Sequence, residues 1–236
     1  MVCEKTANYK MEFMIKTMID DNVFRSKFIE LREQVTEILA SISGCHGFDH
    51  TERVLNNARL IAKMENAPDI QIIECAALLH DIGRSEEIAS KGKHCHAAFG
   101  AKIAAAMLEK MRFPEPFAIQ VAECVRKHRY RRGVQPETLA EKIVYDADKL
   151  DSIGAVGIGR AFYFAGREGA VLHNSAAEAM AAPEYSHGDS AYREYLMKLR
   201  HIEGKLLTEA ARKLAAQRAG FMHDFFEQLN RETDLK

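Results

Sequence analysis

Apolar residues recur at steps of three and four along most of this 236-residue chain, which is the spacing of one face of an α-helix. The clearest example begins at Asp21 and ends near Ser41. No segment shows a convincing strand-like alternation of apolar and polar residues, so we predict an all-α fold. Helices are predicted at about 21–41, from 50 onward, and at 70–83, 94–111, 116–128, 136–152 and 189–230.

The composition supports closely packed helices in one domain. Aromatic residues make up 8% of the chain, Trp is absent, and alanine-rich stretches recur. No linker, repeat or shift in composition marks a boundary, so we predict a single domain over residues 1–236. Its motif-bearing core spans about 21–165, and helices at about 189–230 pack on it as a C-terminal extension. Gly204 and Gly220 interrupt that extension, which is compatible with one bent helix or two packed helices.

Charge and cysteine content narrow the classes of function. Lys and Arg number 33 against 34 Asp and Glu, so we expect no nucleic-acid partner. No apolar run approaches the roughly 18 residues that span a bilayer, and the N-terminus has no signal-peptide pattern, so we expect no membrane partner. The five cysteines form no CxxC pair and indicate reduced thiols, which favours a cytoplasmic location.

Histidine and aspartate residues stand at the ends of the predicted helices. His80 and Asp81 directly follow the most apolar stretch of the chain, and His50 lies at the start of another predicted helix. Burying such groups without partners costs several kcal/mol, and a shared divalent cation removes that cost. We therefore predict a metal site at these helix ends.

Two neighbouring aspartates are candidates for a further metal ligand. Asp146 and Asp148 are two residues apart and so point to nearly opposite sides of a helix. Asp148 lies beside the apolar stripe of its helix, so we predict Asp148 as the ligand and Asp146 as a group that supports the ligands by hydrogen bonding. A donor set of nitrogen and oxygen without thiolate suits Mn, Mg, Fe, Co, Ni or Zn.

Three motifs in this order resemble those of the HD-domain metal-dependent phosphohydrolases, small single-domain bacterial type. They are HxxRV at His50–Val54, LLHDIG at Leu78–Gly83 and ADKL at Ala147–Leu150, and the resemblance spans roughly residues 46–164. It implies an all-α fold in which one divalent metal is bound by His50, His80, Asp81 and Asp148. Members with two metals add further histidines, and His96 and His128 stand where those would be, with Asp81 as the bridge between the ions.

The resemblance also implies a reaction. We expect a divalent-metal-dependent phosphohydrolase that acts on a small-molecule nucleotide, with manganese among the candidate metals and metal-bound hydroxide attacking phosphorus. Nucleoside triphosphate pyrophosphohydrolase is the preferred activity. The alternatives are a 5′-nucleotidase-like phosphomonoesterase, an HD-type di-iron oxygenase, and a non-catalytic metal- or nucleotide-binding module. The base, the sugar, the cleaved bond, the physiological metal and the oligomeric state stay open, and a homo-oligomer is compatible with the sequence.

Cations close to the proposed ligands are candidates for binding phosphate. We predict Asp81, Arg84 and Lys149 as catalytic residues, and substrate contacts from Arg53, Arg84, His96, His128 and Lys149. Glu86 and Glu87 are both candidates for a general base. The run from Arg126 to Arg132 is compatible with attraction of a polyphosphate and equally with a solvated helix end. His46 is a candidate for orienting a ligand, and His94 for capping the helix that carries His96.

Overall fold

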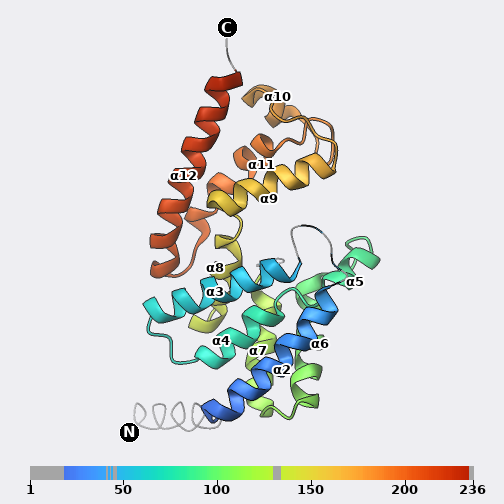
Figure 1. The fold of residues 1–236 in the computed structure, drawn as a ribbon, viewed down its shortest axis with the longest axis vertical. Coiled ribbons are helices and arrows are strands. Elements are labelled where there is room, and N and C mark those ends of the chain that lie inside the picture. Colours follow the sequence, from blue (N-terminus) through green and yellow to red (C-terminus); the bar gives the residue numbers. More distant parts are fainter. Residues whose placement is uncertain (1–18, 41, 43, 45–46, 130–133, 234–236) are drawn as a thin grey trace. The chain divides into compact units, whose positions relative to one another are not determined.

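The computed structural model describes residues 19–40, 42, 44, 47–129 and 134–233 (Figure 1). Within these ranges the regular elements are helices and no strand is present, which confirms the all-α fold. None of the helices in the described ranges is long and apolar enough to cross a membrane. The helices are α2 (Asp21–Leu39), α3 (Phe48–Met64), α4 (Ile70–Leu79), α5 (Arg84–Ala89), α6 (His96–Lys110), α7 (Glu115–Lys127), α8 (Leu139–Leu150), α9 (Gly154–Arg167), α10 (Ala176–Ala181), α11 (Ala191–Met197) and α12 (Glu209–Thr233), with the short 3-10 helices η1 (Leu199–His201) and η2 (Glu203–Lys205).

The described residues divide into two compact units. The first is drawn from Met1–Ile42 and Ala67–Tyr145, and the second from Ser43–Asn66 and Asp146–Lys236. The boundary falls within α8, which begins in the first unit and ends in the second. The expectation of a single domain over residues 1–236 stays a prediction.

The first unit is built around the apolar helix α4. Its side chains from Ile72 to Leu79 are almost all buried, and α4 packs against α7 and α2. Such continuous burial explains why the sequence of α4 is apolar on all sides. Phe24 and Phe117 meet edge to face in this core, with ring centroids 6.5 Å apart.

Helix α6 approaches the end of α4 through two glycines. A Cβ atom on Gly83 would lie 2.4 Å from the carbonyl oxygen of His96 and 2.7 Å from the amide nitrogen of Gly100. Any side chain at residue 83 would therefore push α6 away. The glycine that ends the LLHDIG motif thus allows the first turn of α6 to lie beside His80 and Asp81.

The second unit packs α12 against α9 and α3. Phe226 of α12 stacks on Tyr195 with ring centroids 4.4 Å apart, and it is fully buried. The guanidinium of Arg218 donates to the carbonyl oxygen of Leu150 at 2.7 Å and to Oδ1 of Asn57 at 2.9 Å, so α12 also holds the end of α8 and the middle of α3.

The structure corrects several predicted helix boundaries. Helix α3 begins at Phe48, two residues before the predicted start at 50, with Gly47 as its N-cap. The region 189–230 contains two helices, α11 and α12, separated by η1 and η2 around Gly204, whereas Gly220 lies inside α12. Between the predicted helices that end at 152 and begin at 189, the structure contains α9 and also α10, which has a capping box formed by Ser175 and Glu178. Helix α5 was not expected from the sequence.

Candidate metal centre

Asp81 lies immediately after α4 and is 1% exposed. Its two carboxylate oxygens face different histidines of the same unit. Oδ1 lies 3.2 Å from Nε2 of His96 and 3.7 Å from Nε2 of His128, whereas Oδ2 lies 3.7 Å from Nε2 of His80. One carboxylate therefore addresses imidazoles on two sides, as expected for a group that bridges two ions.

His96 and His128 place their Nε2 atoms 3.2 Å apart. His96 is the first residue of α6, His128 follows the last residue of α7, and both side chains are 1% exposed. Together with Asp81 they form a buried trio whose donor atoms all lie within 4.8 Å of one another, a spacing that can hold a metal ion.

Nδ1 is held by an oxygen atom in each of the three imidazoles around Asp81, those of His80, His96 and His128. The three contacts are His80 to the carbonyl of Ala77 at 2.8 Å, His96 to Oε2 of Glu87 at 2.7 Å, and His128 to the carbonyl of Val125 at 2.7 Å. An oxygen acceptor requires a proton on Nδ1, so in the neutral form of each ring Nε2 presents a lone pair. Metal-binding histidines use this arrangement.

The chemistry of the trio fits a divalent cation. Burial lowers the pKa of His96 to about 4, so its imidazole is neutral near pH 7. Nε2 of His96 and Oδ1 of Asp81 then face each other with their lone pairs at 3.2 Å, an arrangement that a cation would stabilise. Neutral imidazole and carboxylate are the ligand types that bind Mn, Fe, Co, Ni and Zn.

Glu87 connects the trio to two arginines. Its carboxylate receives Nδ1–H of His96, pairs with Arg129, and accepts from Arg84 at 3.0 Å. Partial burial opposes ionisation, but the contacts with His96 and Arg129 hold the pKa of Glu87 well below its usual range. Arg84 also donates from Nε to Oδ2 of Asp81 at 3.0 Å. Glu87 is thus occupied in orienting His96, and Arg84 lies directly beside the proposed bridging carboxylate.

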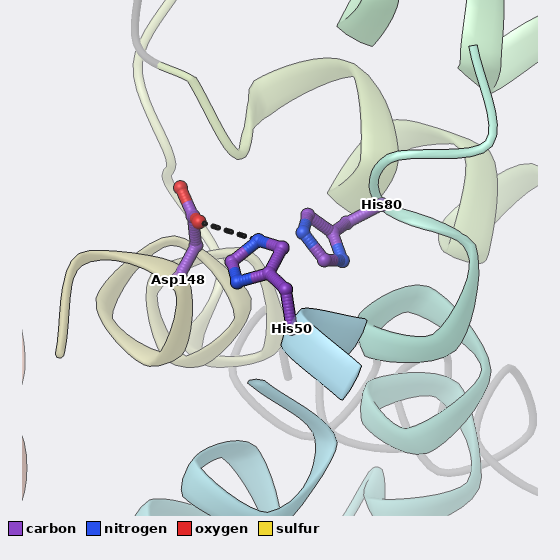
Figure 2. Close-up of side chains that lie close together, drawn as sticks. All are labelled: His50, His80 and Asp148. Atoms are coloured by element: carbon purple, nitrogen blue, oxygen red, sulfur yellow. Dashed lines mark ion pairs between the residues drawn. The ribbon is translucent and has the colours of Figure 1, made fainter. Parts of the chain in front are cut away.

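In the second unit, His50 faces two aspartates. Nε2 of His50 lies 3.5 Å from Oδ1 of Asp148 (Figure 2), and Nδ1 lies 2.7 Å from Oδ2 of Asp151. His50 is fully buried in the first turn of α3, and Asp148 projects from the last turn of α8. His50 therefore shares the pattern of the other imidazoles, with an oxygen on Nδ1 and Nε2 directed toward a proposed ligand.

Arg53 and Lys149 lie beside carboxylates of the second unit. Arg53 donates to Asp151 and, at 2.7 Å, to Asp49, so its guanidinium is engaged by two carboxylates. Lys149 donates to Oδ2 of Asp148 at 2.9 Å. Both assignments as substrate contacts stay predictions, and Lys149 lies nearer to a proposed ligand.

Asp146 has a different role from the one expected. It accepts hydrogen bonds from the amides of Leu207 and Thr208 and from the hydroxyl of Thr208, at the start of α12. Burial raises the pKa of Asp146, and these hydrogen bonds oppose the rise. Asp146 thus anchors α12 to α8, and its oxygens are directed at α12.

Other sequence candidates fall outside this constellation. His94 is exposed and bonds to Glu86 at 2.7 Å, and Cys95, not His94, is the N-cap of α6. His46 and the part of the basic run at 130–132 lie outside the described residues. The described cations of that run pair with carboxylates of their own unit: Arg126 with Glu123, Lys127 with Glu141, and Arg129 with Glu87.

Sequence reasoning missed Asp151, Arg160 and the part played by Glu87. Arg160 donates to Oδ2 of Asp151 at 2.5 Å. The spacing of Asp148 and Asp151, three residues apart at a helix end, was a usable signal, because residues three apart share a face. Arg160 gave no such signal, since it reaches Asp151 only through the packing of α9.

Comparisons with known proteins agree with this reading. The HD domain family matches residues 47–153. The Bacillus subtilis protein YpgQ is 31% identical over 207 residues, covering 86% of this chain and 92% of its own. The crystal structure of YpgQ in complex with ADP has a TM-score of 0.70 at 29% identity, covering 89% of this chain and 96% of that one. An HD superfamily hydrolase from an uncultured Thermotogales bacterium has a TM-score of 0.62 at 32% identity, covering 86% and 91%.

The matched region contains all three motifs, and the similarity to YpgQ extends over most of both chains. The all-α fold and the imidazole and carboxylate donors agree with that match. The chain belongs to the HD-domain superfamily of metal-dependent phosphohydrolases.

Proposed function

We propose that this protein hydrolyses nucleoside triphosphates to nucleoside monophosphate and pyrophosphate with a divalent metal ion. In this reaction a water oxygen forms a bond to the α-phosphorus, and the bond from that phosphorus to the oxygen bridging to the β-phosphorus breaks. The observation that carries the proposal is the convergence of imidazole Nε2 atoms on the Asp81 carboxylate, with Arg84 beside it.

The proposed ligands of the first ion are His50, His80, Asp81 and Asp148. Support comes from the order of the HD motifs and from the hydrogen bonds of the two histidines, since Nδ1 of His50 and of His80 each bonds to an oxygen atom. The trio Asp81, His96 and His128 suits a second ion, with Asp81 shared between the two. When bound, a divalent metal lowers the pKa of coordinated water and neutralises phosphate oxygens.

Charged side chains around the proposed ligands would bind the substrate. Arg84 and Lys149 each touch a proposed ligand carboxylate, and their side chains are 18% and 25% exposed. A triphosphate carries oxygens that can take the place of solvent on these cations. We propose that Arg84 and Lys149 bind the phosphates whose negative charge grows as the bond breaks. Arg53 already pairs with Asp151 and Asp49, so its contact with the substrate should be weaker.

The nucleotide in this proposal rests on a relative. YpgQ has been crystallised with ADP, which supplies an adenine, a ribose and two phosphates. The two chains are 29% identical and share the fold over 89% of this chain, so we extend nucleotide binding to this protein. Manganese is the first metal to test, because the donor set of imidazole and carboxylate accepts it. We place the reaction in the cytoplasm, since the described cysteines Cys75, Cys95 and Cys124 are free thiols.

Separation of reaction products by anion exchange tests the proposal. Protein loaded with Mn²⁺ is incubated with nucleoside tri-, di- and monophosphates of both sugars, and its metal content is measured in the same sample. We expect monophosphate and pyrophosphate in equal amounts from the triphosphates. Nucleoside and phosphate from monophosphates would replace the proposal with a phosphomonoesterase. Metal-loaded protein that turns over none of these substrates would refute the nucleotide assignment.

A further inference from the structure

Asp151 is a buried carboxylate that the proposed chemistry leaves without a task. Its side chain is 2% exposed, and it follows the last residue of α8. Oδ2 of Asp151 is hydrogen-bonded to Nδ1 of His50 at 2.7 Å and to the guanidinium of Arg160 at 2.5 Å. Oδ1 accepts a hydrogen bond from Nε of Arg53 at 2.7 Å. All four residues belong to the second unit, so one carboxylate there is surrounded by one imidazole and two guanidinium groups.

The charges around Asp151 keep it an acceptor. Two guanidinium groups donate to this carboxylate: Nε of Arg53 to Oδ1 at 2.7 Å, and Arg160 to Oδ2 at 2.5 Å. A guanidinium can donate hydrogen bonds but cannot accept them, so both oxygens of Asp151 act as acceptors. The proton in the contact between Asp151 and His50 therefore resides on Nδ1 of His50.

This proton decides what the other side of the imidazole can do. With Nδ1 protonated, Nε2 carries a lone pair, and it lies 3.5 Å from Oδ1 of Asp148 (Figure 2). The opposite tautomer would place a proton on Nε2, where it would donate to Asp148 and block a metal. The ring orientation is restricted as well, because rotation would break the bond to Asp151.

We propose that Asp151 is a positioning residue that sets the tautomer and orientation of His50 for metal binding, with Arg53 and Arg160 holding Asp151 in place. The inference deepens the proposed function and rests on His50 being a ligand. It gives Arg53 a role different from phosphate binding: the arginine supports the group behind the ligand. It also gives a role to Arg160, which lies beyond the residues matched by the HD family.

Asp49 offers a matched control within the same network. It also pairs with Arg53 at 2.7 Å, but it is 67% exposed, whereas the carboxylate that contacts Nδ1 of His50 at 2.7 Å is that of Asp151. Asp151→Asn and Asp49→Asn therefore remove one negative charge each from a partner of Arg53. Only the first change alters the group that holds Nδ1.

The test measures tautomer and metal affinity separately. Long-range ¹H–¹⁵N NMR of metal-free wild-type protein identifies the protonated nitrogen of His50, with a His50→Gln variant to assign the signal. We expect the Nδ1–H tautomer in wild type and in Asp49→Asn, and a mixture or the Nε2–H tautomer in Asp151→Asn. Mn²⁺ titration should show a loss of affinity of roughly 10–100-fold for Asp151→Asn and less than about twofold for Asp49→Asn.

Each outcome decides one question. Wild-type protein with His50 protonated on Nε2 overturns the inference. This measurement needs no variant, so it decides the question even where Asp151→Asn does not fold. A folded Asp151→Asn protein with unchanged tautomer or unchanged Mn²⁺ affinity also overturns it. Wild-type protein that shows the expected tautomer but binds no Mn²⁺ contradicts the metal site of the proposed function instead.

Discussion

The two units contribute polar clusters of opposite character. In the first unit, three imidazoles surround the single carboxylate Asp81, and two Nε2 atoms face each other at 3.2 Å. In the second, the single imidazole of His50 lies between two carboxylates, and Arg53, Arg160 and Lys149 pair with those carboxylates.

The two clusters differ in how far the charges of their polar groups are balanced by other groups of the protein. The second cluster balances its charges with its own arginines and lysine, so it keeps its geometry without an added ion. In the first cluster, Arg84 donates to Oδ2 of Asp81, whereas Oδ1 faces the Nε2 atoms of His96 and His128, and a cation bound there would relieve the repulsion between their lone pairs. Metal binding should therefore stabilise the structure of the first cluster. The second cluster should already have its geometry before a metal ion binds.

Asp81→Ala should give the largest effect, because Asp81 is the one carboxylate of the first cluster's trio. We expect metal content measured by mass spectrometry to fall to background and turnover to fall below detection. Arg84 keeps its bond to Glu87 in this variant, so the helical circular dichroism should be unchanged. Glu30→Gln, which changes an exposed acid of the same unit on α2, is the control and should keep both metal and activity. A folded Asp81→Ala protein that retains metal contradicts the site.

Removal of metal by a chelator should destabilise the protein by an intermediate amount. At a metal concentration of about 100 times Kd, binding contributes about 2.7 kcal/mol, which corresponds to roughly 5–10 °C in Tm for a chain of this size. Hydrogen exchange measured with and without chelator should locate the change. We expect faster exchange around residues 80–82 and 96–98, and a smaller change at 147–151. Equal changes in both places would show that the two clusters do not differ as described.

Asp146→Ala should have the smallest effect of the three, and one that is independent of metal. The variant removes the acceptor for Leu207 and Thr208 at the start of α12, and loss of such a cap costs about 1–2 kcal/mol. Denaturant unfolding at pH 7 with and without chelator measures it, with exposed Glu209→Gln as the control. A loss that disappears in chelator would assign Asp146 to the metal and not to α12.

Periodicity predicted the helices well because burial of one face is a local property of the sequence. The apolar stretch of α4, with His80 and Asp81 at its end, was predicted in this way, as were the helices that carry His96 and His128. The capping box of α10 was also readable, since Ser175 and Glu178 stand three residues apart, but weak apolar periodicity concealed it.

The supporting contacts could not be read in the same way. The choice of Asp148 over Asp146 as a ligand used the helix periodicity, and it stays a prediction. The structure shows that Asp146 accepts a hydrogen bond from Thr208, 62 residues away, a contact that no local pattern indicates. The bonds of His50 to Asp151 and of Asp151 to Arg160 join α3, the end of α8 and α9. Hydrogen bonds between elements depend on tertiary packing, which no local pattern encodes.

The anchoring of α8 by α12 has a consequence for protein synthesis. A ribosome makes Asp146 and Asp148 long before Thr208 and Arg218, whose bonds hold the end of α8. A nascent chain must therefore grow past this point, and release it from the exit tunnel, before the turn that carries Asp148 acquires its final support. The order of translation thus delays completion of the second cluster until most of the chain has been made.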